Sequence, residues 1–165
     1  MKNHVWALVA VLLAGAAAGA AAQDAPAAPV LDARVEAALK TTGLPYTVDG
    51  GDFRLNFTLP DGRTQLVWIA SKTTKIASTE FRDVWSVASR TKGSLPAELA
   101  DHLLKENVRM VLGAWQVSQG KDEHLVVFSY AVPADTNADL LQEVIEAVTI
   151  SADRMEKELT GKDEF

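Results

Sequence analysis

The chain has 165 residues, a formal net charge of −6 and no cysteine, so it can form no disulfide bond. A chain of this length fits one domain whose core is large enough to be stable without cross-links. The acidic balance argues against nucleic acid as a main partner, because binding phosphate groups requires a basic surface.

The N-terminus has the pattern of an export signal. Lys2 precedes an apolar run, and small residues follow this run up to Ala22. We therefore expect residues 1–22 to be a signal peptide that is cut after Ala22, and the protein to be periplasmic or secreted. An uncleaved membrane anchor is the alternative, because the apolar stretch approaches spanning length. Residues 23–30 are rich in Pro and Ala and are expected to be a linker.

The next part of the chain predicts a helix and then a run of strands. Leu31, Val35 and Leu39 recur at helical spacing, and Gly43 is placed to end that helix. Between residues 46 and 70, alternating apolar and polar residues are separated by two glycine-containing turns, which predicts three antiparallel strands. Residues 78–90 fit a fourth strand, and a short helix at residues 78–85 is the competing interpretation.

The C-terminal half predicts a helix, two strands and a long final helix. The first helix is expected to span residues 94–112, and the two strands to lie near residues 112–118 and 124–132. The apolar stripe of the helix at residues 94–112 consists of Leu99, Leu103, Leu104, Val108 and Val111. Thr136 is expected to cap the final helix, with Asp139 in the capping-box position. The apolar stripe of the final helix consists of Leu141, Val144, Ile145, Val148, Ala152, Met155 and Leu159.

These elements predict an α+β fold, an antiparallel sheet of five to six strands with three helices in the order α-β-β-β-(β)-α-β-β-α. The domain is expected to span residues 31–160, followed by a tail at residues 161–165. The apolar stripes of the helices must cover one face of the sheet. The other face is then expected to have nothing in this chain to cover it.

The sequence contains no recognisable catalytic constellation. It has no cysteine nucleophile and no Gly-x-Ser-x-Gly turn, and it has no glycine-rich phosphate loop between a strand and a helix. His102 and His124 are the only histidines after the expected cleavage site, and we interpret both as solvated surface residues. We therefore predict that the protein is not an enzyme and has no metal site and no cofactor.

Aromatic residues on the predicted strands are the candidate binding residues. Trp68, Trp115, Phe128 and Tyr130 could belong to the core, because aromatic side chains fit a half-buried pleated surface. They could instead form a contact surface, because Trp and Tyr give large contact areas at interfaces. We hypothesise a homodimer or a peptide groove centred on these four residues, on the uncovered face of the sheet.

The segment LLKENVRMVLGAWQVSQGKDEHLVVFSYAVPADTNADLLQEVIEAVTISADRMEKEL, residues 103–159, resembles the YbjN-like bacterial domain family. The matching features are a helix that ends in Asn107, Leu112-Gly113 before a strand, Val132-Pro133 at the end of the next strand, and Ala152-Asp153 in the final helix. The family resembles, in turn, the fold of type III secretion chaperones. The resemblance implies a helix-sheet-helix binding fold, often dimeric, with no catalytic residues.

The expected function is that of a non-enzymatic exported binding or chaperone-like module, which docks a protein or peptide partner through its sheet. The alternative is a structural or stress-related factor of the cell envelope that acts through homo-oligomerisation and binds no small molecule. No membrane contact is expected after cleavage of the signal peptide.

Overall fold

The computed structural model describes residues 30–119 and 123–165. The expected signal peptide (1–22) and the expected linker, except for Val30, lie outside the described residues. Residues 120–122, between the strands predicted near residues 112–118 and 124–132, also lie outside them.

The described residues form an α+β fold with three helices and a seven-stranded antiparallel sheet, as the fold class predicts. The elements are α1 (Ala33–Thr42), β1 (Thr47–Asp49), β2 (Asp52–Thr58), β3 (Thr64–Ile69), β4 (Thr74–Ile76), β5 (Thr79–Lys92), α2 (Ala97–Asn107), β6 (Ala114–Gln119), β7 (Glu123–Pro133) and α3 (Ala138–Thr160). The uncertain stretch at 78–90 is a strand, the greater part of β5. The short β4, which pairs with β5, brings the count above the predicted five or six strands.

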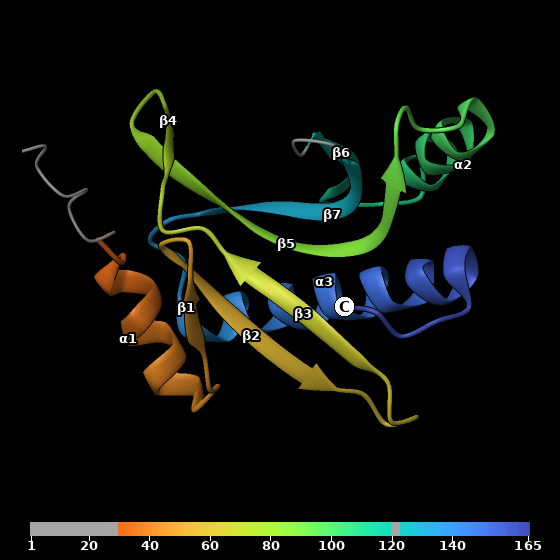
Figure 1. Cartoon of the computed structure of the whole chain (residues 1–165). Helices are drawn as coiled ribbons and strands as arrows, with labels where there is room; N and C mark the ends of the chain where they lie inside the picture. Colours follow the sequence, from red (N-terminus) through yellow and green to blue (C-terminus); the bar gives the residue numbers. More distant parts are fainter. Residues whose placement is uncertain (1–29, 120–122) are drawn as a thin grey trace, which may run out of the picture.

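The strands are ordered β1-β2-β3-β5-β7-β6 across the sheet (Figure 1). The long β5 is central, since it pairs with β3, β4 and β7. Its register against β7 shifts between Val87 and Ser89, which is a β-bulge. Bulges bend a strand and increase its twist.

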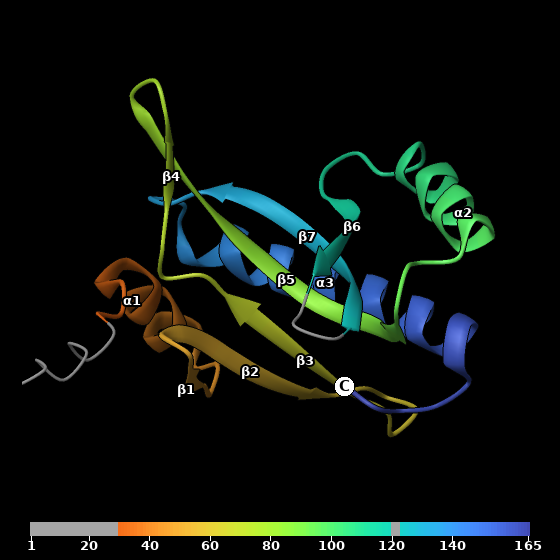
Figure 2. The same ribbon diagram turned by 45° about the horizontal axis from the view of Figure 1, so that its top comes forward.

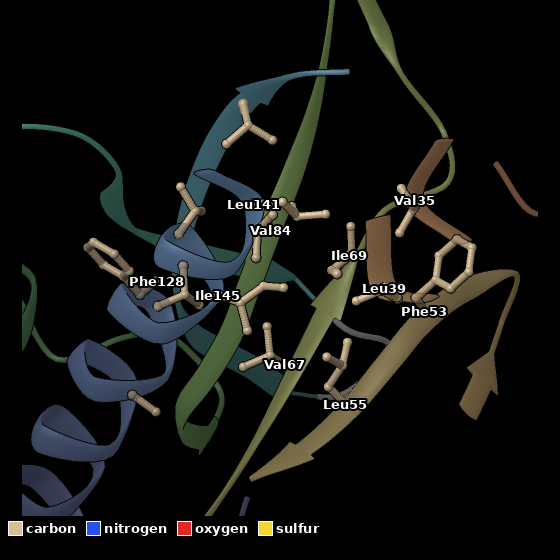
Figure 3. Close-up of a cluster of buried hydrophobic side chains, with 14 of the residues drawn as sticks. Val35, Leu39, Phe53, Leu55, Val67, Ile69, Val84, Phe128, Leu141 and Ile145 are labelled. Carbon is tan, nitrogen blue, oxygen red and sulfur yellow. The ribbon is translucent and has the colours of Figure 1, made fainter. Parts of the chain in front are cut away.

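All three helices pack toward one face of the sheet. Helix α3 crosses strands β3, β5 and β7, with α1 beside it at the β1–β2 end and α2 at the β6 end (Figures 1 and 2). Leu141 and Ile145 of α3 meet Val67 and Val84 of the sheet in the core (Figure 3). The predicted stripe of α3 is confirmed, because six of its members are buried and Leu159 is partly buried. We call this side the covered face.

The helix ends follow local side-chain chemistry. Asp32 caps α1 by accepting a hydrogen bond from the backbone N–H of Arg34, and Gly43 ends the helix at φ 71°, so the predicted glycine stop is confirmed. The predicted cap of α3 is wrong by one residue. Asn137 accepts a hydrogen bond from the N–H of Leu140, whereas the N–H of Thr136 donates to Pro133 in the turn after β7.

Helix α2 is shorter than predicted. It ends at Asn107, whose side chain donates to the carbonyl of Trp115 and accepts from its N–H, at 3.2 and 2.7 Å. The chain therefore leaves the helix early and turns toward β6. Val108 and Val111 of the predicted stripe are consequently 86% and 94% exposed, and Leu104, still within the helix, is also exposed. Only Leu103 of the predicted stripe is buried, while Leu99 is partly buried.

Candidate binding surface

The four predicted site residues do not share one face of the sheet. Trp115 and Phe128 lie on the covered face, 5% and 2% exposed, with their ring centroids 5.1 Å apart. Tyr130 packs partly buried against the same core. Trp68 alone lies on the opposite face, in a second cluster. The expected single groove through all four residues is therefore wrong, because successive strand residues point to opposite faces and counting could not fix the register.

The opposite face carries a compact apolar cluster without any helix among the described elements. Trp68 and Trp85 stack across β3 and β5, with ring centroids 4.6 Å apart and an interplanar angle of 10°. Val87, Leu125 and Val127 complete the cluster on β5 and β7. We call these five residues the free face. The predicted site included only Trp68 of these five and missed the other four, Trp85, Val87, Leu125 and Val127.

The chain itself covers part of the free face. Phe165, in the segment expected to be a tail, is 7% exposed and packs against Val87 and Val127. The guanidinium of Arg90 lies 5.5 Å from the centroid of its ring, within the range of a cation–π contact. The expectation that nothing in this chain covers the second face is therefore wrong. No sequence period signals this contact, since Phe165 follows the helix stop at Gly161.

Polar contacts tie the same segment to the turn between β2 and β3. Arg63 donates to the carbonyl of Lys162 at 2.7 Å, and Asp163 accepts from the N–H and the hydroxyl of Thr64 at 3.0 and 3.2 Å. The N–H of Glu164 donates to the carboxylate of Glu156. The segment thus runs from the end of α3 back along β3 (Figure 1).

A charge cluster lies beneath these contacts. Arg63 pairs with Asp153 and Glu156 of α3, and the hydrogen bond to Asp153 is the main cause of its raised pKa. Burial raises the pKa of Glu156, although the N–H of Glu164 and the charge of Arg63 oppose this shift. Arg63 therefore joins α3, the β2–β3 turn and the final segment.

A hollow of about 200 Å³ opens beside the free face. Trp85 and Val127 form its apolar floor, and polar groups line it at Asp83 and Ser129, whose hydroxyl donates to the Asp83 carboxylate at 3.3 Å. The other lining residues are Ala70, Gln116 and Ser118. Apolar floors with a few placed polar groups are typical of binding sites.

A second apolar region surrounds the start of β6. Leu104, Val108, Val111, Leu112 and Val117 are all large, apolar and exposed. A groove of about 180 Å³ runs between α2 and β6, lined mainly by apolar side chains that include Leu95, Leu103 and Trp115. We call the five exposed residues the α2–β6 patch.

The groups that could carry catalysis are dispersed. His102 Nε2 lies 3.1 Å from a carboxylate oxygen of Glu158 on α3, whereas His124 bonds to the carbonyl of Gly93, so the two rings lie in separate surroundings. Both rings are partly buried rather than fully solvated. Across residues 30–119 and 123–165, no three His, Cys, Asp or Glu side chains are gathered as a metal site would need.

None of the helices in the described part of the chain has both the length and the apolar character needed to cross a membrane. The arrangement thus offers two apolar surfaces: a free face that Phe165 partly covers, and the α2–β6 patch at one edge of the sheet. No protein-family model matches the sequence, and no curated protein matches it.

Proposed function

We propose that the protein is a non-enzymatic binding module that docks a peptide or protein segment on the free face. The observation that carries this proposal is the stacked Trp68–Trp85 pair, half-buried on a side of the sheet with no helix, beside an open hollow. Tryptophan gives large, rigid contact area at low conformational cost, which is why it dominates binding surfaces.

The rigidity of the scaffold supports the same proposal. Both tryptophans stand on β3 and β5, which are paired on both sides within the sheet. Their positions are therefore set before a partner arrives, which lowers the entropic cost of binding. We further propose a chaperone-like role outside the cytoplasm, with cleavage of the signal peptide after Ala22. The YbjN-like resemblance and the N-terminal sequence support this part of the proposal.

A phage-displayed peptide library tests the binding function directly. The library is panned on the purified protein, and the selected peptides are then measured against Trp85→Arg and Leu140→Arg. Leu140 lies exposed on α3, away from the free face, and its substitution is the matched control. Selected peptides should bind the wild type and the control equally, and lose at least about tenfold in affinity to Trp85→Arg.

Circular dichroism must show that both variants are folded, because lost binding by an unfolded variant carries no information about the face. If no peptide is enriched, or if all three proteins bind the selected peptides equally, the proposed function is wrong.

The α2–β6 patch favours a second candidate function, an envelope factor that acts through homo-oligomerisation. Strand β6 is an edge strand, and its sequence AWQVSQ has no charge and no proline to discourage pairing with another strand. The backbone N–H of Trp115 already donates to Asn107, whereas Val117 is 45% exposed and open to another strand. Sedimentation analysis should then show an oligomer that Val117→Lys dissociates, with Val48→Lys on the short β1 edge as control. A monomeric wild type at high concentration would exclude this function.

A further inference from the structure

The segment from Lys162 to Phe165 has the features of a bound peptide. It is neither helix nor strand, and its first three residues are exposed, while Phe165 is inserted into the cluster of the free face. Gly161, in the left-handed conformation at φ 64°, turns it away from α3. Its contacts to the sheet are thus one buried aromatic ring and a short series of hydrogen bonds.

We propose that this segment is an internal ligand of the free face, and that the partner is an extended acidic peptide with an aromatic residue two positions after an aspartate. This inference rests on the proposed function, because it names the occupant of the same surface. The contacts of the internal segment show which groups would bind such a peptide. Thr64 donates twice to Asp163, Glu156 accepts from the N–H of Glu164, and the cluster receives Phe165.

The preference for an acidic occupant comes from the two donors of Thr64, because Arg63 and Arg90 are already paired with carboxylates of the domain. Arg63 and Arg90 flank the two ends of the segment, at the carbonyl of Lys162 and over the ring of Phe165. Asp163 and Glu164 of the segment are acidic, and neither side chain is buried. A partner carboxylate in place of Asp163 would accept the same two hydrogen bonds from Thr64, and bonds to a charged acceptor are stronger than neutral ones.

The internal segment fills only part of the available surface. The hollow beside the free face remains open. It shares Trp85 and Val127 with the cluster around Phe165 and also reaches Asp83. A longer peptide can occupy the Phe165 seat and extend into this hollow, where Asp83 would accept a hydrogen bond. Such a peptide makes contacts that the internal segment lacks, which allows it to displace a tethered competitor.

The test is direct competition with a copy of the segment. A fluorescent peptide with the sequence of residues 159–165 is titrated into the wild type, Phe165→Ala, Asp163→Ala and Lys162→Ala, and binding is followed by fluorescence anisotropy. A tethered segment competes at a millimolar effective concentration, so emptying the seat should strengthen binding at least about tenfold in Phe165→Ala. Asp163→Ala removes only the bonds to Thr64 and should give a smaller increase, about threefold.

Lys162→Ala is the matched control, because only its backbone carbonyl contacts the sheet and its side chain pairs only with the exposed Glu164, so it should bind as the wild type does. A peptide in which alanine replaces its phenylalanine should fail to bind any of the four proteins. Asp163→Ala, an exposed position, keeps the test decisive even if Phe165→Ala does not fold.

Equal peptide affinity for the wild type and both emptied variants, or no binding to them, would overturn the inference. If library-selected peptides still bind the free face in that case, the proposed function stands and the segment is only structural. If neither kind of peptide binds, both proposals fail together.

Discussion

The two faces of the sheet are built from the same strands and differ in what covers them. The covered face is closed by three helices and holds Phe53, Val84 and Phe128, each at most 2% exposed. The free face has one stacked tryptophan pair, three aliphatic residues and the single ring of Phe165. Most of the buried apolar side chains lie on the covered face, so stability depends mainly on that face.

The strongest test of this difference is the same substitution placed on each face. Phe128→Asp should unfold the domain, with a loss of more than about 4 kcal/mol, because it buries an unpaired charge in the core. Trp68→Asp should leave the domain folded, since Trp68 is only half-buried, although the variant loses the hydrogen bond from the indole N–H to Asp49 at 3.0 Å and adds a second carboxylate beside it. Near-UV circular dichroism shows whether each variant is folded, and urea unfolding measures its free energy of unfolding. Two equally destabilised variants would remove the distinction between the faces.

The stability of the domain should depend strongly on the carboxylate that pairs with Arg82, a cation buried on the covered face. Arg82 is 3% exposed and donates to Asp32 at 2.6 Å and to the carbonyl of Ala70 at 2.8 Å. Asp32→Ala should cost about 3 kcal/mol, because it leaves a buried cation without its carboxylate and removes the cap of α1. Asp61→Ala, at an exposed carboxylate, is the control and should cost less than about 1 kcal/mol in urea unfolding.

The same ion pair should make the covered face sensitive to acid. The hydrogen bond from Arg34, together with Arg82, holds the pKa of Asp32 well below its usual range. A lowered pKa in the folded state adds stability above the unfolded-state pKa of about 3.9, and this stability is lost as the pH falls below it. The stability advantage of the wild type over Asp32→Asn should therefore shrink between pH 5 and pH 2. A constant difference would contradict this assignment.

The smallest expected effect concerns a glycine that packs against the covered face. Gly113 has φ 78°, and an added Cβ would lie 2.9 Å from the ring of Phe128. Gly113→Ala should cost about 2 kcal/mol, from backbone strain and from displacement of the ring. Gly62→Ala provides the comparison, because Gly62 has φ 85° and nothing within 4 Å, so it should cost about 1 kcal/mol. Thermal unfolding measures the difference between the two.

The sequence allowed the fold class to be predicted because its strongest signals are periodic. The stripe of α3 and the alternation of Phe53 and Leu55 each place several residues on one side, and an error at one position does not change the result. The predicted length of α2 was wrong because the side chain of Asn107 bonds to Trp115, which belongs to the following strand β6. Local periodicity contains no information about such a contact.

The candidate site was less predictable than the fold. Trp68 was grouped with three residues that belong to the core, and its pairing with Trp85 depends on the register between β3 and β5. The bulge at Val87 and the insertion of Phe165 were not visible either, since both arise from contacts between distant segments. Faces of strands that are apolar on both sides are the hardest feature to assign from sequence, because either register buries apolar groups.

The central position of β5 has a consequence for the order in which the chain can fold. Its main partner, β7, is separated from it in sequence by α2 and β6, so their pairing requires the closure of a long loop. Helix α3, which covers this pair, comes later still. Contacts between such distant segments slow folding, and β5 is paired along both of its sides in the complete sheet. The amide hydrogens of β5 should then exchange with solvent only through global unfolding.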